Sequence, residues 1–126
     1  MRLHTFAAAC TFLLAPAAAF AHGTPPAPAH GGQVVEDSAE HWVELVTSGD
    51  LLTVYVLDED RNPVPSAQLG GKATVLASGK REEVALTLGE GNSLTGRLAA
   101  PVSGKMTAVL QLTVGGKPAT VRFAVG

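Results

Sequence analysis

The feature that most constrains this chain is an alternation of apolar and polar residues after residue 33. It is clearest over residues 106–114, where every second residue is apolar: Met106, Ala108, Leu110, Leu112 and Val114. The pattern resumes after Gly115-Gly116 and continues over residues 119–125. Because successive side chains of a strand point to opposite faces, this pattern predicts two strands with one buried face. The paired glycines predict a tight hairpin turn between them.

Shorter alternating runs, separated by turn residues, precede this hairpin. They predict strands over residues 42–45, 52–56, 73–77, 84–88 and 94–98, with a further strand if Val34 and Val35 also pair. No stretch after residue 21 keeps the apolar period of a helix. Residues 33–126 are therefore predicted to form an all-β domain, an immunoglobulin-like antiparallel β-sandwich of seven or eight strands. A small Greek-key barrel is the alternative.

The core of this domain must consist mainly of aliphatic side chains. Trp42, Tyr55 and Phe123 are the only aromatic residues after residue 21. We expect Met106 in the core, and Trp42 and Tyr55 in the core or between the sheets, where large rings usually pack. A core of this size is expected to leave no room for a deep internal pocket of several hundred cubic ångströms, so any chemistry would take place on an edge of the domain or in the tether.

Residues 1–21 have the pattern of a secretory signal peptide. Arg2 precedes an apolar run over residues 6–14, and Ala19-Phe20-Ala21 supplies the small residues of a cleavage site. The apolar stretch is shorter than the roughly 20 residues of a membrane-spanning helix. We therefore expect cleavage after Ala19 or Ala21 and a periplasmic chain without a membrane span. Cys10, the only cysteine, would be removed with this leader, which leaves no disulfide.

Composition and motifs exclude several classes of function. Residues 22–32 are rich in Pro, Gly and Ala, and they predict a flexible tether. The chain carries 9 Lys and Arg against 11 Asp and Glu, so nucleic acid is not an expected partner, because phosphate binding needs clustered positive charge. The sequence has no nucleophile elbow, phosphate-binding loop or His-Glu-x-x-His motif, and we predict that the protein is not an enzyme.

The main chemical signal is a cluster of three histidines, His22, His30 and His41, within the first 20 residues after the leader. Imidazole is a good ligand for copper, zinc and nickel, and an exported protein meets these ions without competing cytosolic thiols. We therefore predict a metal site formed by these histidines, with copper or zinc as the bound ion. If cleavage follows Ala21, the α-amine and imidazole of His22 could chelate one copper ion together, with His30 or His41 as a further ligand. If it follows Ala19, His22 is third from the terminus, and the amine, two amides and its imidazole could bind Cu²⁺ in a square plane.

Each histidine also has a structural interpretation, in which His30 lies in a polar turn and His41 begins a strand or faces solvent. The neighbouring carboxylates could supply oxygen ligands or orient an imidazole, although a solvated acidic edge is the favoured interpretation for them. These carboxylates are Glu36, Asp37, Glu40 and Glu44. His41 and Glu44 differ by three positions, so a regular strand would place them on opposite faces.

The segments 21–23, 30–35 and 43–46, which read Ala-His-Gly, His-Gly-Gly-Gln-Val-Val and Val-Glu-Leu-Val, resemble the start of a family of small uncharacterised proteobacterial periplasmic proteins. Segments 54–56, 71–76, 91–94 and 119–123 agree, so the resemblance covers essentially the whole mature chain. Members tend to be encoded near heavy-metal efflux systems. His22 and His30 match the family pattern, whereas His41 does not match it regularly.

The resemblance implies an accessory role in heavy-metal handling, in which the protein binds or buffers copper, zinc, nickel or cobalt or delivers it to an efflux system. An efflux adaptor subunit is then the expected partner. A different class of function is a metal-free interaction module that docks through an exposed sheet edge. A third hypothesis is a copper oxidase or oxygenase built on a terminal histidine chelate.

Overall fold

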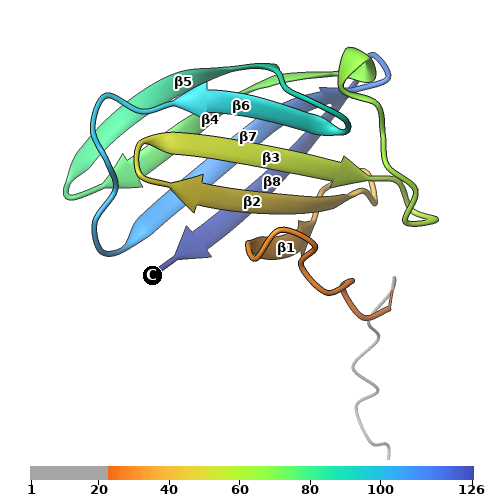
Figure 1. Cartoon of the computed structure of the whole chain (residues 1–126), viewed down its shortest axis with the longest axis horizontal. Coiled ribbons are helices and arrows are strands. Elements are labelled where there is room, and N and C mark those ends of the chain that lie inside the picture. Colours follow the sequence, from red (N-terminus) through yellow and green to blue (C-terminus); the bar gives the residue numbers. More distant parts are fainter. Residues whose placement is uncertain (1–22) are drawn as a thin grey trace, which may run out of the picture.

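Eight antiparallel strands make up most of the structure, a computed structural model that describes residues 23–126 (Figure 1). The predicted signal peptide, including Cys10, and His22 lie outside the described residues. The elements are β1 (Gln33–Glu36), β2 (Trp42–Ser48), β3 (Leu51–Leu57), the 3-10 helix η1 (Ser66–Gln68), β4 (Leu69–Ala77), β5 (Lys80–Leu88), β6 (Ser93–Arg97), β7 (Met106–Val114) and β8 (Lys117–Val125). The predicted strand around Val34 and Val35 is confirmed as β1. No helix in the described part of the chain has the length and apolar character needed to cross a membrane.

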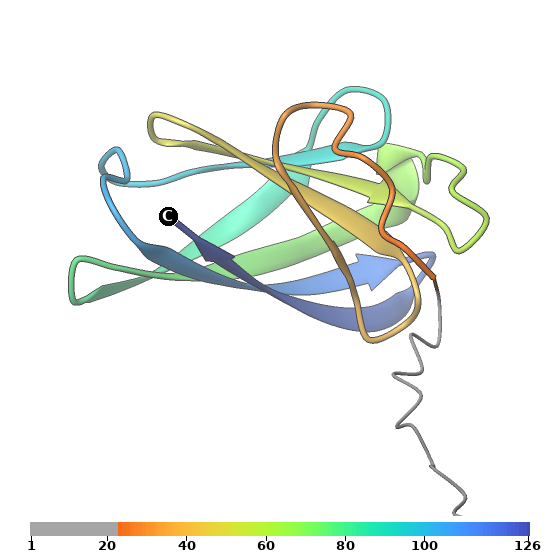
Figure 2. The same ribbon diagram turned by 90° about the horizontal axis from the view of Figure 1, so that it is seen from below.

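The strands form one continuous sheet in the order β1-β2-β3-β6-β5-β4-β7-β8. Strand β5 joins the part of the sheet formed by β1, β2, β3 and β6 to the part formed by β4, β7 and β8. It pairs with β4 along most of its length and with β6 at Thr87 and Leu88. Figure 2 shows β2, β3 and β6 in one layer and β4, β7 and β8 in the other. The prediction of an all-β antiparallel fold is confirmed. The immunoglobulin-like sandwich is not confirmed, since the layers belong to one nearly closed, barrel-like sheet.

The C-terminal hairpin has the predicted register and turn. Strands β7 and β8 pair from Met106 opposite Val125 to Val114 opposite Lys117. Gly115 and Gly116 have φ values of 56° and 80°, the left-handed backbone that a primed two-residue turn requires. The apolar parity of β7 is buried throughout, Met106 included. Each fully buried Leu or Phe of this face stabilises the fold by roughly 1.5–3 kcal/mol.

The two ends of the sheet meet at the turn between β1 and β2. The backbone N–H of Ser38 donates a 3.0 Å hydrogen bond to the Thr120 carbonyl of β8. In return, the Thr120 N–H donates to Ser38 Oγ at 2.9 Å. Among the described strands, β1 and β8 lie close together without pairing as neighbours, and these two hydrogen bonds mark the seam of the barrel.

Strand β2 is buried on both of its faces. Val43 and Leu45 belong to the hydrophobic core. Trp42 and Glu44 have the opposite parity and are also buried, although neither belongs to that core. A cover therefore lies over the outer face of this strand, and this cover positions the candidate site.

Candidate functional site

The cover of β2 is the segment of residues 24–32, here called the N-terminal strap (Figure 1). Together with Trp42, Glu44 and Tyr55, it encloses a small cavity of about 40 Å³ on the outer face of β2 and β3. At the start of the strap, the Thr24 carbonyl accepts a 2.6 Å hydrogen bond from Arg61 Nη2. The Arg61 guanidinium also lies 5.8 Å from the centre of the Trp42 ring, within the range of a cation–π contact. The segment predicted as a flexible tether thus makes specific contacts in the structure.

His30 is held at the other end of the strap by the buried carboxylate of Glu44. Glu44 Oε1 lies 2.9 Å from His30 Nδ1, and Oε2 accepts hydrogen bonds from the backbone N–H groups of His30 at 3.0 Å and Gly32 at 2.9 Å. An ionised carboxylate only accepts hydrogen bonds, so His30 Nδ1 carries a proton. In a neutral ring, the lone pair then lies on Nε2, which has no hydrogen-bond partner among residues 23–126.

Gly32 lets the strap approach β2 closely enough for these bonds. A Cβ atom at this position would lie 2.3 Å from the Leu45 carbonyl oxygen and 2.9 Å from a Val46 methyl group. Gly31 has a φ of 73°, a left-handed conformation that side chains rarely adopt. The His-Gly-Gly sequence therefore combines a functional group with the backbone freedom that seats it on Glu44.

The environment of Glu44 favours its charged form. Burial by itself would raise the pKa of this carboxyl, because a low-dielectric surrounding disfavours charge. The hydrogen bonds from the His30 ring and from the backbone N–H groups of Gly32 and His30 outweigh burial, and the net pKa lies below its usual value of 4.5. Glu44 is therefore a fixed anion at neutral pH.

Tyr55 completes the immediate surroundings of His30. It lies directly across from Glu44 in the β2–β3 pair. Its ring is stacked on the imidazole, with centroids 3.6 Å apart and planes inclined by 4°. The side chain of His30 remains 42% exposed, so the ring is oriented by Glu44 and Tyr55 without being enclosed.

His41 has a similar arrangement in the turn between β1 and β2. The side chain of Asp37 is fully buried, and its Oδ2 lies 2.8 Å from His41 Nδ1. Its Oδ1 accepts hydrogen bonds from the backbone N–H groups of Ala39 at 2.8 Å and His41 at 2.9 Å. With an ionised Asp37 carboxylate, Nδ1 is again the donor, and Nε2 has no hydrogen-bond partner in the described chain.

The structure thus places His30 and His41 in separate carboxylate–imidazole pairs. The predicted solvated acidic edge is wrong for Asp37 and Glu44, which are buried and orient imidazoles instead. Within residues 23–126, no three side chains of His, Cys, Asp or Glu are grouped so that they could hold a metal ion together. The position of His22 lies outside the described residues.

The contribution of the outer face of β2 and β3 was not predicted. Trp42 and Tyr55 were expected in the core or between sheets, but Trp42 packs under the strap, and Tyr55 stacks on His30. The alternation of residues in β2 could have predicted which side chains face the strap. With Val43 and Leu45 facing inward, Trp42 and Glu44 had to face outward.

In comparisons with protein-family models, curated proteins and solved structures, the chain has no match.

Proposed function

We propose that the protein is an exported, non-enzymatic accessory protein that handles a heavy-metal ion through His22, His30 and His41. Copper and zinc are the preferred ions, with nickel and cobalt as further candidates. One observation carries the proposal: both described histidines have Nδ1 hydrogen-bonded to a buried carboxylate and Nε2 without a partner in residues 23–126.

This arrangement prepares an imidazole for coordination. Histidines that bind metals usually donate their second ring N–H to a carboxylate or carbonyl, which fixes the tautomer and raises the basicity of the ligating nitrogen. In His30 the ring is also held flat by Tyr55, so little side-chain freedom remains to be lost on binding.

The number of ligands favours transfer over storage. Because His30 and His41 sit in separate pairs, each would supply one imidazole, and further ligands would come from His22, water or a partner. Open coordination positions allow ligands to exchange. We propose a metal-efflux adaptor subunit as the partner that receives the ion.

Calorimetric titration of the processed protein with Cu²⁺ and Zn²⁺ tests the proposal. We expect a double variant, His22→Ala with His30→Asn, to bind the preferred ion at least tenfold more weakly. Asn at position 30 retains an N–H donor for Glu44, so the strap can remain docked. A second variant, Glu44→Gln, keeps His30 but weakens the hydrogen bonds that orient its ring. It should bind the ion with an affinity between those of wild type and the double variant. Binding of wild type no tighter than that of the double variant would refute metal handling by these histidines.

A second candidate is a metal-free interaction module that docks by strand addition. The observation in its favour is the arrangement of β1 and β8, the terminal strands of the sheet, which lie close together without pairing, while Ser38 of the β1–β2 turn is hydrogen-bonded to Thr120 of β8. An exposed edge can accept a strand from another protein. Co-purification with an efflux adaptor that persists in a triple histidine-to-alanine variant would favour this function over metal handling.

A further inference from the structure

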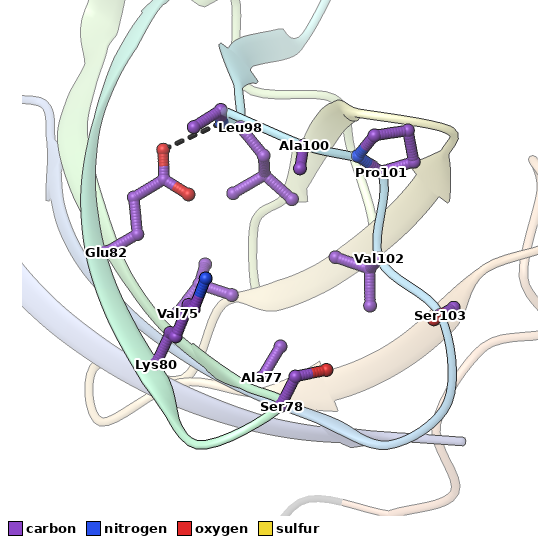
Figure 3. A pocket seen from close by; sticks show the side chains of 11 residues that line it. Val75, Ala77, Ser78, Lys80, Glu82, Leu98, Ala100, Pro101, Val102 and Ser103 are labelled. Carbon is purple, nitrogen blue, oxygen red and sulfur yellow. Dashed lines mark hydrogen bonds between the residues drawn. The ribbon is translucent and has the colours of Figure 1, made fainter.

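A separate cavity of about 340 Å³ opens where the β4–β5 hairpin faces the loop of residues 98–103 (Figure 3). It shares no residue with the cavity beside His30. Val75 and Leu98, both members of the hydrophobic core, line it together with Val102. The space lies between a hairpin and a loop at the mouth of the barrel, so it is not the deep internal pocket that the small core was expected to exclude. Barrel mouths are common positions for ligand sites, and this volume is at the lower end of their range.

Two charged side chains of β5 line this cavity. Lys80 and Glu82 share the parity of Val84 and Leu86, which are buried in the core. Figure 3 shows Glu82 directed toward the loop, and Lys80, which also lines the cavity, is exposed to solvent. Arg81 and Glu83 have the opposite parity and pair with each other, with Arg81 Nη2 3.3 Å from Glu83 Oε1.

Both charged side chains retain unused bonding capacity. Glu82 Oε1 accepts a 2.8 Å hydrogen bond from the Ala99 N–H, the dashed line in Figure 3, which connects the hairpin to the loop. Its second oxygen has no partner among residues 23–126, and Lys80 forms no ion pair there. Residues two apart on a strand are separated by about 7 Å. The cavity therefore presents an ammonium group and a carboxylate side by side above an apolar surface.

We propose that this cavity binds a small zwitterion with an apolar side chain, namely an apolar α-amino acid. The ligand carboxylate pairs with Lys80, its ammonium group donates to the free oxygen of Glu82, and its side chain contacts Val75, Leu98 and Val102. A ligand with only a carboxylate would place its negative charge near the Glu82 carboxylate without an ammonium group to pair with it. A ligand with only an amine would place its positive charge near the Lys80 ammonium group without a carboxylate to pair with it. The paired charges thus select against both single-charge analogues.

Calorimetric titration of the processed full chain with L-leucine, 4-methylpentanoate and 3-methylbutylamine tests this proposal. We expect saturable binding of leucine and at least tenfold weaker binding of each analogue. Lys80→Met and Glu82→Gln should each weaken leucine binding at least tenfold. Gln at position 82 retains an oxygen for the Ala99 N–H, so the contact between hairpin and loop is preserved. Arg81→Met and Glu83→Gln, on the other face of the same strand, are the matched controls and should bind as wild type does.

The location of the ligand is tested independently by methyl NMR. Addition of leucine should shift the methyl resonances of Val75, Leu98 and Val102 and leave those of Val43 and Leu45 in place. This measurement uses the unaltered protein and holds even if a β5 variant fails to fold. Absence of leucine binding at millimolar concentration would overturn the proposal, as would 4-methylpentanoate binding as tightly as leucine. Equal losses in Lys80→Met and Arg81→Met would overturn it too.

Discussion

The imidazole of His30 lies flat on the ring of Tyr55, with 3.6 Å between the ring centroids and 4° between the planes. Tyr55 is the cross-strand neighbour of Glu44, which holds the edge of the same imidazole. One pair of strands thus provides both the surface beneath the ring and the acceptor beside it. The N-terminal strap is consequently fixed to the barrel at His30, one of the residues proposed to bind a metal ion.

Loss of the stacked ring should loosen the strap. Tyr55→Leu removes the aromatic contact, and we expect the free energy of unfolding to fall by about 0.5–1.5 kcal/mol. Hydrogen exchange at the Gly32 N–H, which bonds to Glu44, should become faster. Tyr55→Phe keeps the ring and serves as the control. Equal exchange rates in the Leu variant and wild type would show that stacking does not hold the strap.

Glu44 should make stability depend on acidity. Because its pKa is lowered in the folded state, its contribution is complete above the unfolded value of about 4.5 and is lost as the pH falls through the folded pKa. Urea unfolding at pH 6 and at about pH 3 should therefore show a larger loss for wild type than for Glu44→Gln. Other carboxyl groups titrate in both proteins, so the difference between them isolates Glu44. Equal losses would contradict the role assigned to its hydrogen bonds.

The carboxylate of Asp37 should be needed for the turn that closes the barrel. Asp37→Ala leaves the N–H groups of Ala39 and His41 without their acceptor, and we expect a loss of about 1–3 kcal/mol in unfolding free energy. Asp37→Asn retains an acceptor oxygen and should lose less. Asp60→Ala, at an exposed loop position, is the surface control, with an expected change within about 0.5 kcal/mol. Chemical denaturation measures all three, and a loss in Asp37→Ala no larger than the surface control would contradict this assignment.

A single methyl group at Gly32 should displace the strap. Its Cβ would overlap the Leu45 carbonyl, so we expect Gly32→Ala to expose Trp42 and shift its fluorescence to longer wavelength. Trp42 is the only tryptophan, which makes the signal specific. Gly70→Ala is the matched control, because the nearest atom to a Cβ there lies 4.0 Å away. An unshifted spectrum in Gly32→Ala would show that the strap tolerates the added group.

The sequence predicts the strands better than it predicts the strap. In β7 and β8, alternation and the Gly115-Gly116 turn act locally, so register and buried face follow from neighbouring residues alone. Closure into a barrel depends on contacts between distant residues, such as Ser38 and Thr120, which no local pattern encodes. The same limit explains why a Pro- and Gly-rich segment suggested a tether although its partners, Glu44 and Tyr55, lie on strands.

The candidate site is likewise predictable only in part. The histidines stand out as residue types, and the nearby carboxylates suggest orientation of an imidazole as one possible role. The assignment of Asp37 to His41 and of Glu44 to His30 depends on a turn and on the path of the strap. Neither the turn nor the path of the strap can be read from spacing along the chain. In the structure, both carboxylates are buried and hydrogen-bonded to the imidazoles that they orient.

The seam at Ser38 and Thr120 has a consequence for how the molecule opens. Every other junction around the ring is a ladder of paired strands, whereas here β1 and β8 lie close together without pairing and two hydrogen bonds connect Ser38 with Thr120. Thermal fluctuations should therefore open the structure first at this seam. The ends of the sheet should separate there well before the paired strands do.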